Sequence, residues 1–183
     1  MSTIAATRSK TYDIVYIAVF AVIMAICSWI SIPTAVPFTL QTFGVFVAVG
    51  VLGGKRGTLS ILVFILLGAI GVPVFAGFSG GVQNLIGPTG GFIISFPIMA
   101  YVIGLCVEHR KKKGMFVLML ILGTVLNYVI GVAMFCIIMN SSVMTGITAC
   151  VLPFIPTAII KAVVAALLGL QIRSRLGAAL QWA

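Results

Sequence analysis

Acidic side chains are nearly missing from this sequence, which has only two carboxylates, Asp13 and Glu108, among its 183 residues. Both lie close to basic residues at the edge of a long apolar run, and the interiors of these runs contain no acid. A proton relay through intramembrane carboxylates is therefore excluded. The sequence also offers no carboxylate pair and no nucleophile with a matching base, so it predicts that the protein is not an enzyme.

Metal-binding side chains are also scarce. The chain has one histidine, His109, and four cysteines without C-x-x-C spacing. The cysteines are Cys27, Cys106, Cys136 and Cys150. Because they lie in or near apolar runs, we interpret them as small buried hydrophobic residues. The usual spacing rules assemble no zinc or iron site, so we expect neither a metal nor another cofactor.

A phosphate-binding loop is lacking as well. The stretch Gly50-Val51-Leu52-Gly53-Gly54-Lys55-Arg56 resembles one superficially. Such a loop needs a glycine at position 49 and a serine or threonine after the lysine, whereas this chain has Val49 and Arg56. The chain by itself therefore cannot power transport with ATP.

Charged residues make up only 7% of the chain and hydrophobic residues 62%, with a mean hydropathy of +1.30. A soluble domain has roughly 25% charged residues, so this composition predicts an all-α integral membrane protein. Apolar segments of spanning or near-spanning length lie at about 13–31, 41–53, 57–72, 91–108, 115–139 and 156–172. They predict one domain over 1–183, a single bundle of six transmembrane helices. The net charge of +9 does not indicate nucleic acid binding, because the basic residues flank the spans.

The charges in the breaks between these segments set their orientation. Ten of the eleven Lys and Arg residues fall in the breaks 1–12, 54–56, 109–114 and 173–183, and the breaks 32–40, 73–90 and 140–155 hold no charge. The segments 41–53 and 57–72 are short, and one alternative folds 41–72 as a re-entrant hairpin. That alternative would move Lys55 and Arg56 outside or into the bilayer, against the positive-inside rule. We therefore predict six crossings with both termini cytoplasmic.

The eleventh basic residue, Lys161, lies inside the last apolar segment, near its outer end. A lone ammonium group within a membrane helix is costly, and it usually marks a functional site with an anionic partner. The chain has no acid nearby, so the partner would be a ligand that accepts a charge-assisted hydrogen bond. The alternative is a lysine that extends to the outer lipid headgroups.

Amide and hydroxyl side chains are predicted at the same outer level. Gln41 opens the second segment, while Asn84, Gly87 and Thr89 lie in a glycine-rich connection. Amides offer a donor and an acceptor to a neutral headgroup such as a urea, and glycine lets the backbone approach a ligand closely. As alternatives, Thr89 is a helix N-cap and the two amides bond only to neighbouring loops.

Aromatic side chains complete this predicted outer site. They are Trp29, Phe38, Phe75, Phe78 and Phe92. These side chains form either the wall of a ligand pocket or an aromatic belt at the membrane interface, and the sequence does not divide them between the two roles.

Small residues recur on the first segment, at Ala18, Ala21, Ala25 and Ser28. Their spacing of three and four residues places them on one helix face, where another helix can approach closely. That helix belongs either to the same bundle or to a partner protein, and both alternatives are open at this stage.

Three motifs resemble those of a known family. They are Pro37-Phe38-Thr39-Leu40-Gln41-Thr42-Phe43-Gly44-Val45, Gly71-Val72-Pro73-Val74-Phe75-Ala76-Gly77 and Gly87-Pro88-Thr89-Gly90-Gly91-Phe92. They are similar to signatures of the BioY family, the biotin-specific substrate-binding (S) components of energy-coupling-factor (ECF) transporters. The resemblance runs over most of the chain.

This resemblance implies six transmembrane helices in the cell membrane of a prokaryote, with biotin bound at the outer side. It also implies a transmembrane coupling (T) subunit and two cytoplasmic ATPases as partners, with Ala21 and Ala25 docking the coupling subunit. Family members often read Pro-Gly-Asp-x-x-Lys before the last helix, whereas this chain has Ala158 at the position of the acid. Any role of that acid must fall to another group or to none.

Biotin matches the predicted outer site in its chemistry. Its carboxylate fits Lys161 by charge, and Gln41 and Asn84 would serve its ureido group or its tail, with the end that each amide meets left open. The glycine-rich backbone would approach the rings. Two other functions are open at this stage: capture of another vitamin by the same architecture, and a passive channel for small solutes.

Overall fold

The computed structural model describes residues 2–34, 36–108 and 113–180. His109 and the basic residues 110–112, which belong to a predicted cytoplasmic break, lie outside the described residues. The long helices are α1 (Ser2–Trp29), α2 (Gln41–Leu52), α3 (Gly54–Ala69), α5 (Gly90–Glu108), α6 (Lys113–Met139) and α8 (Ile155–Leu180). The short elements are β1 (Ser31–Ile32), β2 (Phe38–Thr39), η1 (Ala76–Phe78), α4 (Gln83–Ile86), α7 (Val143–Cys150) and η2 (Leu152–Phe154).

Each apolar segment expected from the sequence coincides with one of the long helices. The main differences are at the ends, because α1 begins well before the apolar run and α8 continues to Leu180. Helix elongation adds one hydrogen bond per residue once a turn exists, so polar residues beyond an apolar run readily extend it. Three stretches of the described chain are long and apolar enough to cross a membrane: Thr11–Trp29, Gly114–Met139 and Val143–Arg175. The protein is therefore a mostly helical membrane protein.

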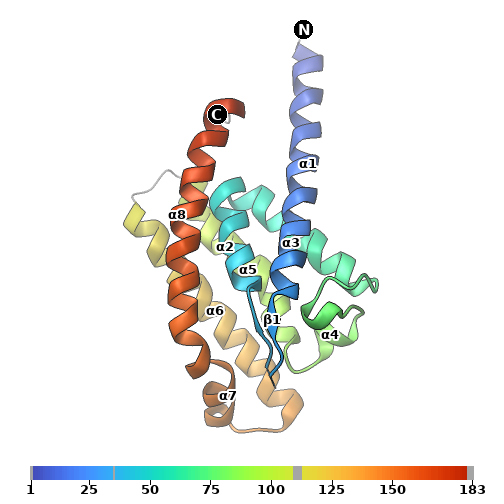
Figure 1. Cartoon of the computed structure of the whole chain (residues 1–183), viewed down its shortest axis with the longest axis vertical. Coiled ribbons are helices and arrows are strands. Elements are labelled where there is room, and N and C mark those ends of the chain that lie inside the picture. Colours follow the sequence, from blue (N-terminus) through green and yellow to red (C-terminus); the bar gives the residue numbers. More distant parts are fainter. Residues whose placement is uncertain (1, 35, 109–112, 181–183) are drawn as a thin grey trace.

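The two ends of the molecule are formed by different elements (Figure 1). The start of α1 and the end of α8 lie at one end, and the β1–β2 hairpin and α7 lie at the other. The strands of the hairpin pair antiparallel, Ser31 with Thr39 and Ile32 with Phe38. The hairpin leads directly into α2, which packs against α1, α3, α5 and α8. This makes α2 the central helix.

The short length of α2 follows from its central position. Its 12 residues rise about 18 Å at 1.5 Å per residue, less than the thickness of the hydrocarbon layer. All of them except Thr42 and Phe43 are buried. A Cβ at Gly50 would lie 3.2 Å from the Cα of Gly169 in α8, so the backbones of these two helices approach closely. Neighbouring helices, not lipid, surround α2.

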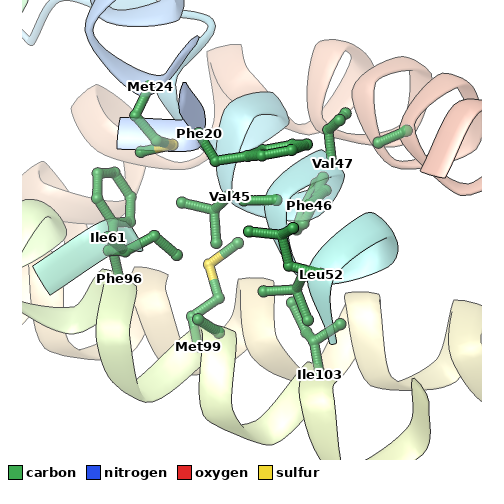
Figure 2. Close-up of a cluster of buried hydrophobic side chains, with 14 of the residues drawn as sticks. Phe20, Met24, Val45, Phe46, Val47, Leu52, Ile61, Phe96, Met99 and Ile103 are labelled. Carbon is green, nitrogen blue, oxygen red and sulfur yellow. The ribbon is translucent and has the colours of Figure 1, made fainter. Parts of the chain in front are cut away.

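The core around α2 joins side chains from four helices (Figure 2). Met24 of α1, Phe46 of α2, Ile61 of α3 and Met99 of α5 are each at most 1% exposed. In a membrane, where lipid is as apolar as these side chains, close van der Waals packing is what favours such a core. The packed helices form the scaffold that positions the site described below.

The small residues of α1 face this core. Ala21 is 3% exposed and Ala25 is 4% exposed, whereas Ala18 lies on the exposed face. Helices α2 and α3 of the same chain pack against α1. Intramolecular packing thus covers both side chains in this structure, and the docking of a partner at Ala21 and Ala25 stays a prediction.

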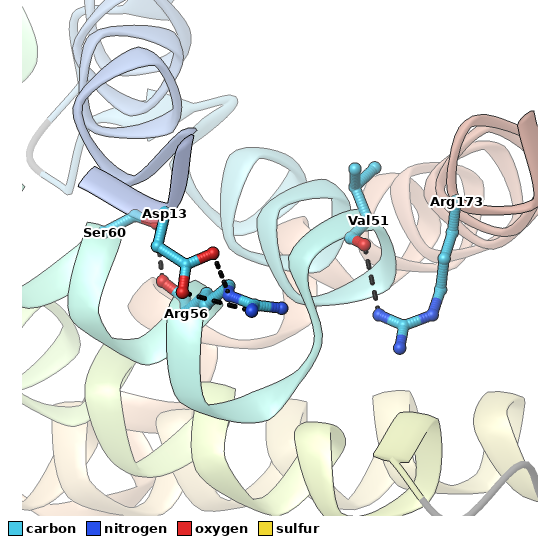
Figure 3. Close-up of polar contacts among 5 residues, drawn as sticks. All are labelled: Asp13, Val51, Arg56, Ser60 and Arg173. Carbon is cyan, nitrogen blue, oxygen red and sulfur yellow. Dashed lines mark hydrogen bonds and ion pairs between the residues drawn. The ribbon is translucent and has the colours of Figure 1, made fainter. Parts of the chain in front are cut away.

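Polar contacts hold the turn between α2 and α3, remote from the hairpin (Figure 3). Arg56 forms an ion pair with Asp13 of α1, with 2.8 Å between Nε and Oδ1. Arg173 of α8 donates from Nη1 to the carbonyl of Val51 at 3.1 Å, which supplies a partner near the end of α2, where helical bonding leaves carbonyls unpaired. Gly53 follows with φ +83°, a conformation that favours glycine, and α3 starts at the next residue.

Candidate ligand-binding site

A cavity of about 130 Å³ lies at the hairpin end of the bundle. Its walls come from the hairpin, the start of α2, the loop that contains η1 and α4, helices α5 and α6, the end of α7, η2 and the start of α8. Aromatic and small side chains supply most of the lining, together with a few amides and hydroxyls and one lysine. None of the lining residues carries a carboxylate.

Lys161 reaches from α8 across to α2 at this cavity. Its Nζ donates to the carbonyl of Thr39 at 3.1 Å and to Oγ1 of Thr42 at 3.0 Å. The ammonium also lies 5.0 Å from the centre of the Phe38 ring, a distance at which a cation is attracted to an aromatic face. The residue is 9% exposed, so it points into the bundle and not toward lipid headgroups.

Among the described residues, dipoles and the Phe38 ring compensate the charge of Lys161, and no carboxylate pairs with it. The carbonyl and the hydroxyl take two of the three protons of the ammonium group. Asp13 is paired with Arg56 in another part of the bundle. Since the cavity lining has no acid, an anion that enters the cavity meets an unneutralised positive charge in a poorly solvated place.

Gln41 lines the cavity but is already held by its own chain. Its Nε2 donates to Oγ of Ser28 at 2.8 Å, and its Oε1 accepts from Oγ1 of Thr39 at 3.2 Å. The side chain is 7% exposed. Gln41 thus ties α1 to the end of the hairpin, next to the carbonyl that holds Lys161.

Asn84 lines the cavity from α4 and is fixed in the loop. Its Nδ2 donates to the carbonyl of Gly80 at 3.0 Å, and its Oδ1 accepts from Oγ of Ser79 at 3.1 Å. Bonding within the loop, the alternative considered for this residue, is therefore present. Asn84 still lines the cavity, and these hydrogen bonds fix the orientation of its side chain.

Thr89 lines the cavity at the start of α5. Within the part of the chain that the structure describes, its hydroxyl makes no hydrogen bond, so the N-cap bond is not formed. Gly87 does not line the cavity, and its carbonyl accepts from the backbone N–H of Gly90 at 2.9 Å. A Cβ at Gly90 would overlap the carbonyl of Leu85. These glycines shape a tight turn, and contact of Gly87 with the ligand stays a prediction.

The aromatic residues divide between two roles. Phe75 and Phe92 line the cavity. Phe38 does not line it, but stacks on Phe154 with ring centres 5.2 Å apart, beside the ammonium of Lys161. Trp29 and Phe78 stack on each other at 5.1 Å, away from the cavity lining.

The stacked pair of Trp29 and Phe78 fastens the glycine-rich loop to α1. The indole Nε1 of Trp29 donates to the carbonyl of Pro73 at 2.8 Å. Trp29 lies at the end of α1, and Phe78 lies in η1. These two aromatic residues therefore position one wall of the cavity without contributing to its surface.

Sequence reasoning missed two lining residues on α6, Asn127 and Tyr128. Asn127 is 1% exposed. It is the only Asn or Gln side chain in an otherwise apolar stretch of α6, the same kind of signal that identified Lys161. Ala158, where the resembled family often has an acid, does not line the cavity.

The sequence profile of the BioY family matches residues 2–178. The chain belongs to the BioY family. The resemblance of its three motifs to this family is thereby confirmed. A biotin transporter BioY from Thermotoga maritima is 40% identical over 156 residues, which cover 85% of this chain and 92% of the relative. A probable biotin transporter BioY from Pyrococcus horikoshii is 41% identical over 163 residues, which cover 87% and 94%.

The fold agrees with that of a solved structure. A crystal structure of the S-component for biotin from an ECF-type ABC transporter matches with a TM-score of 0.84. The match has 27% sequence identity and covers 91% of this chain and 93% of the other. The helical arrangement of this BioY family member is therefore the one seen in an ECF S-component.

Proposed function

We propose that this chain captures biotin at the outer face of the cell membrane of a prokaryote and is the substrate-binding subunit of an ECF-type transporter. The observation that carries the proposal is the cavity with one buried lysine and no acid, in a chain of the BioY family. The relatives are named as transporters, and the chain is accordingly a transport protein and not an enzyme. We expect it to need no cofactor and to bind no nucleic acid.

The chemistry of biotin fits the lining of the cavity. Its carboxylate would replace dipoles around Lys161 with an opposite charge, and a charge-assisted hydrogen bond contributes roughly twice a neutral one. Its ureido ring would meet amide and hydroxyl groups, among them Asn84 and Thr89. Its apolar body would pack on Phe75. Gln41 would act indirectly, because its hydrogen bond with Thr39 holds the residue whose carbonyl accepts from Lys161.

For the membrane topology, we propose one domain over 1–183 with six crossings and both termini cytoplasmic. The charged breaks and the uncharged breaks alternate along the sequence, as the positive-inside rule requires. The start of α1 and the end of α8 lie at one end of the molecule, and the cavity lies at the other. This arrangement supports an outward-facing ligand site.

The proposed partners are a transmembrane coupling subunit and two cytoplasmic ATPases. Support comes from the similarity to an S-component of an ECF-type ABC transporter. The chain has no phosphate-binding loop of its own, so the energy for release must come from other subunits. The docking of the coupling subunit on α1 at Ala21 and Ala25 stays a prediction, and both side chains are buried by their own chain.

Reconstitution should separate this function from its alternatives. The purified chain is expected to bind biotin reversibly without ATP, as measured by isothermal titration calorimetry. Liposomes that contain the chain alone should show no biotin flux, and the coupling subunit with its ATPases should give ATP-dependent uptake. Flux through the chain alone would instead support a passive channel. Displacement of biotin by riboflavin or thiamine would support another vitamin.

Cysteine labelling should report the topology. In a background without native cysteines, Ser142→Cys is expected to react in intact cells with a membrane-impermeant maleimide. Lys55→Cys and Arg175→Cys should react only after permeabilisation, because six crossings place both residues inside. All three side chains are exposed, so failure to react would not come from burial. Labelling of Lys55→Cys in intact cells would favour a re-entrant segment 41–72.

A further inference from the structure

Asn127 is a buried amide at a place where burial is costly. It lies in the apolar stretch of α6, is 1% exposed and lines the cavity. A polar side chain inside a membrane bundle needs hydrogen-bond partners, and where it borders a cavity it is a candidate for function. The contacts of the ureido ring proposed above, with Asn84 and Thr89 among them, do not use this residue.

Contacts with α5 fix the orientation of the Asn127 side chain. Its Nδ2 donates to the carbonyl of Phe92 at 2.9 Å and to Oγ of Ser95 at 2.7 Å. The Ser95 hydroxyl donates its own proton to the same carbonyl at 3.0 Å. Both groups of α5 can therefore only accept from Asn127. A flipped amide would place its oxygen against the carbonyl oxygen of Phe92, so the amide nitrogen must face α5.

This orientation leaves Oδ1 of Asn127 as an acceptor on the side away from α5. Within the described part of the chain it accepts no hydrogen bond. The amide oxygens of Gln41 and Asn84 differ, because each has a hydroxyl donor within reach. Gln41 accepts from Thr39, and Asn84 shares the single proton of the Ser79 hydroxyl with the carbonyl of Ala76. Among the three amides that line the cavity, Asn127 is thus the one whose oxygen has no donor.

We propose that Oδ1 of Asn127 accepts a hydrogen bond from an N–H of the ligand, which is a ureido N–H if the ligand is biotin as proposed above. The residue then determines specificity for ligands with a ring N–H donor. Ser95 and the carbonyl of Phe92 position its amide. Lys161 and Asn127 would recognise opposite chemical features of one molecule, an anionic group and an N–H donor.

A double-mutant cycle on protein and ligand tests the proposal. The ligands are biotin and its two cyclic carbamate analogues, in each of which oxygen replaces one ring N–H. The variant is Asn127→Leu, which keeps the branching and the number of heavy atoms of the side chain and removes the acceptor. For biotin, Asn127→Leu is expected to raise Kd about ten- to a hundred-fold, because a buried ligand donor loses its partner. For one of the carbamates, the change should be less than about three-fold, since that ligand has no proton to donate.

Ser95→Ala is the matched control, because it removes a positioning contact and leaves the acceptor in place. It should still prefer biotin over the same carbamate. An equal loss of affinity for all three ligands in Asn127→Leu would overturn the proposal while leaving biotin binding intact. If Asn127→Leu does not fold, the affinities of the wild type for the three ligands test the proposal instead. Equal affinity for biotin and both carbamates would also refute the proposal. Failure of the wild type to bind biotin would instead refute the proposed function.

Discussion

Lys161→Met is expected to weaken biotin binding by about a hundred-fold or more. Removing one partner of a buried charge pair typically costs 2–5 kcal/mol or more, which corresponds to about thirty-fold to several-thousand-fold in Kd. Lys161 is 9% exposed, and the cavity lining offers no second cation to take the carboxylate. Titration of the purified variant with biotin measures the effect.

The amide of biotin, which lacks the negative charge, identifies the interaction that is lost. The wild type should bind this amide much more weakly than biotin, whereas Lys161→Met should bind both with similar affinity. Lys55→Met, an exposed lysine remote from the cavity, is the charge-matched control and should bind biotin like the wild type. A variant at Lys161 that still prefers biotin over its amide would contradict the assignment.

The same substitution should not destabilise the protein without ligand. The ammonium of Lys161 is buried and is held by a carbonyl and a hydroxyl, with no carboxylate in the cavity lining. A single buried charge carries a large desolvation cost, which an apolar side chain of similar length removes. Thermal unfolding in detergent is therefore expected at an equal or higher temperature for Lys161→Met. This result would separate loss of recognition from loss of fold.

Gly68→Ala is expected to raise the Kd for biotin at least ten-fold, although Gly68 does not line the cavity. A Cβ at Gly68 would overlap the ring of Phe75, which is 1% exposed and packs edge-on against Phe64 with ring centres 5.5 Å apart. The ring has no room on the side of Phe64, so it must move toward the cavity that it lines. Overpacking of this kind also costs about 1–3 kcal/mol of stability. Calorimetric titration and thermal unfolding measure both effects.

A second substitution should relieve this clash. Phe75→Leu in the Gly68→Ala background removes the far end of the ring and is expected to restore part of the lost affinity and stability. Leu66→Ala, on the exposed face of the same helix, is the control and should leave biotin binding unchanged. If Gly68→Ala binds biotin like the wild type, Phe75 is not held between α3 and the cavity.

The helices could be predicted from the sequence because a membrane span requires a long apolar run, a local property. The predicted segments therefore match the long helices, with errors only at their ends. Lys161 could be identified as a candidate site residue for the same reason, since a single charge within an apolar run is visible in the sequence without any knowledge of contacts. Asn127 carried a weaker form of this signal and was overlooked.

The partners of the side chains could not be predicted in this way. Gln41 has an amide group that could bind a ligand, but its amide nitrogen donates to the hydroxyl of Ser28, thirteen residues earlier on α1. Ala21 and Ala25 form a small-residue face, but the sequence does not say whether that face meets its own bundle or a partner. The structure shows that it meets the bundle.

Hydropathy and charge placement along the chain by themselves determined a helical membrane protein and identified Lys161 as a candidate site residue, because the cost of polar groups in lipid acts residue by residue. Only the tertiary structure decided that the amide oxygen of Asn127 has no donor among the described residues, and which aromatic rings line the cavity. It also decided at which glycines a neighbouring backbone or ring comes too close for a Cβ. These outcomes depend on distances between segments far apart in the sequence, and such distances are fixed only when the whole bundle packs.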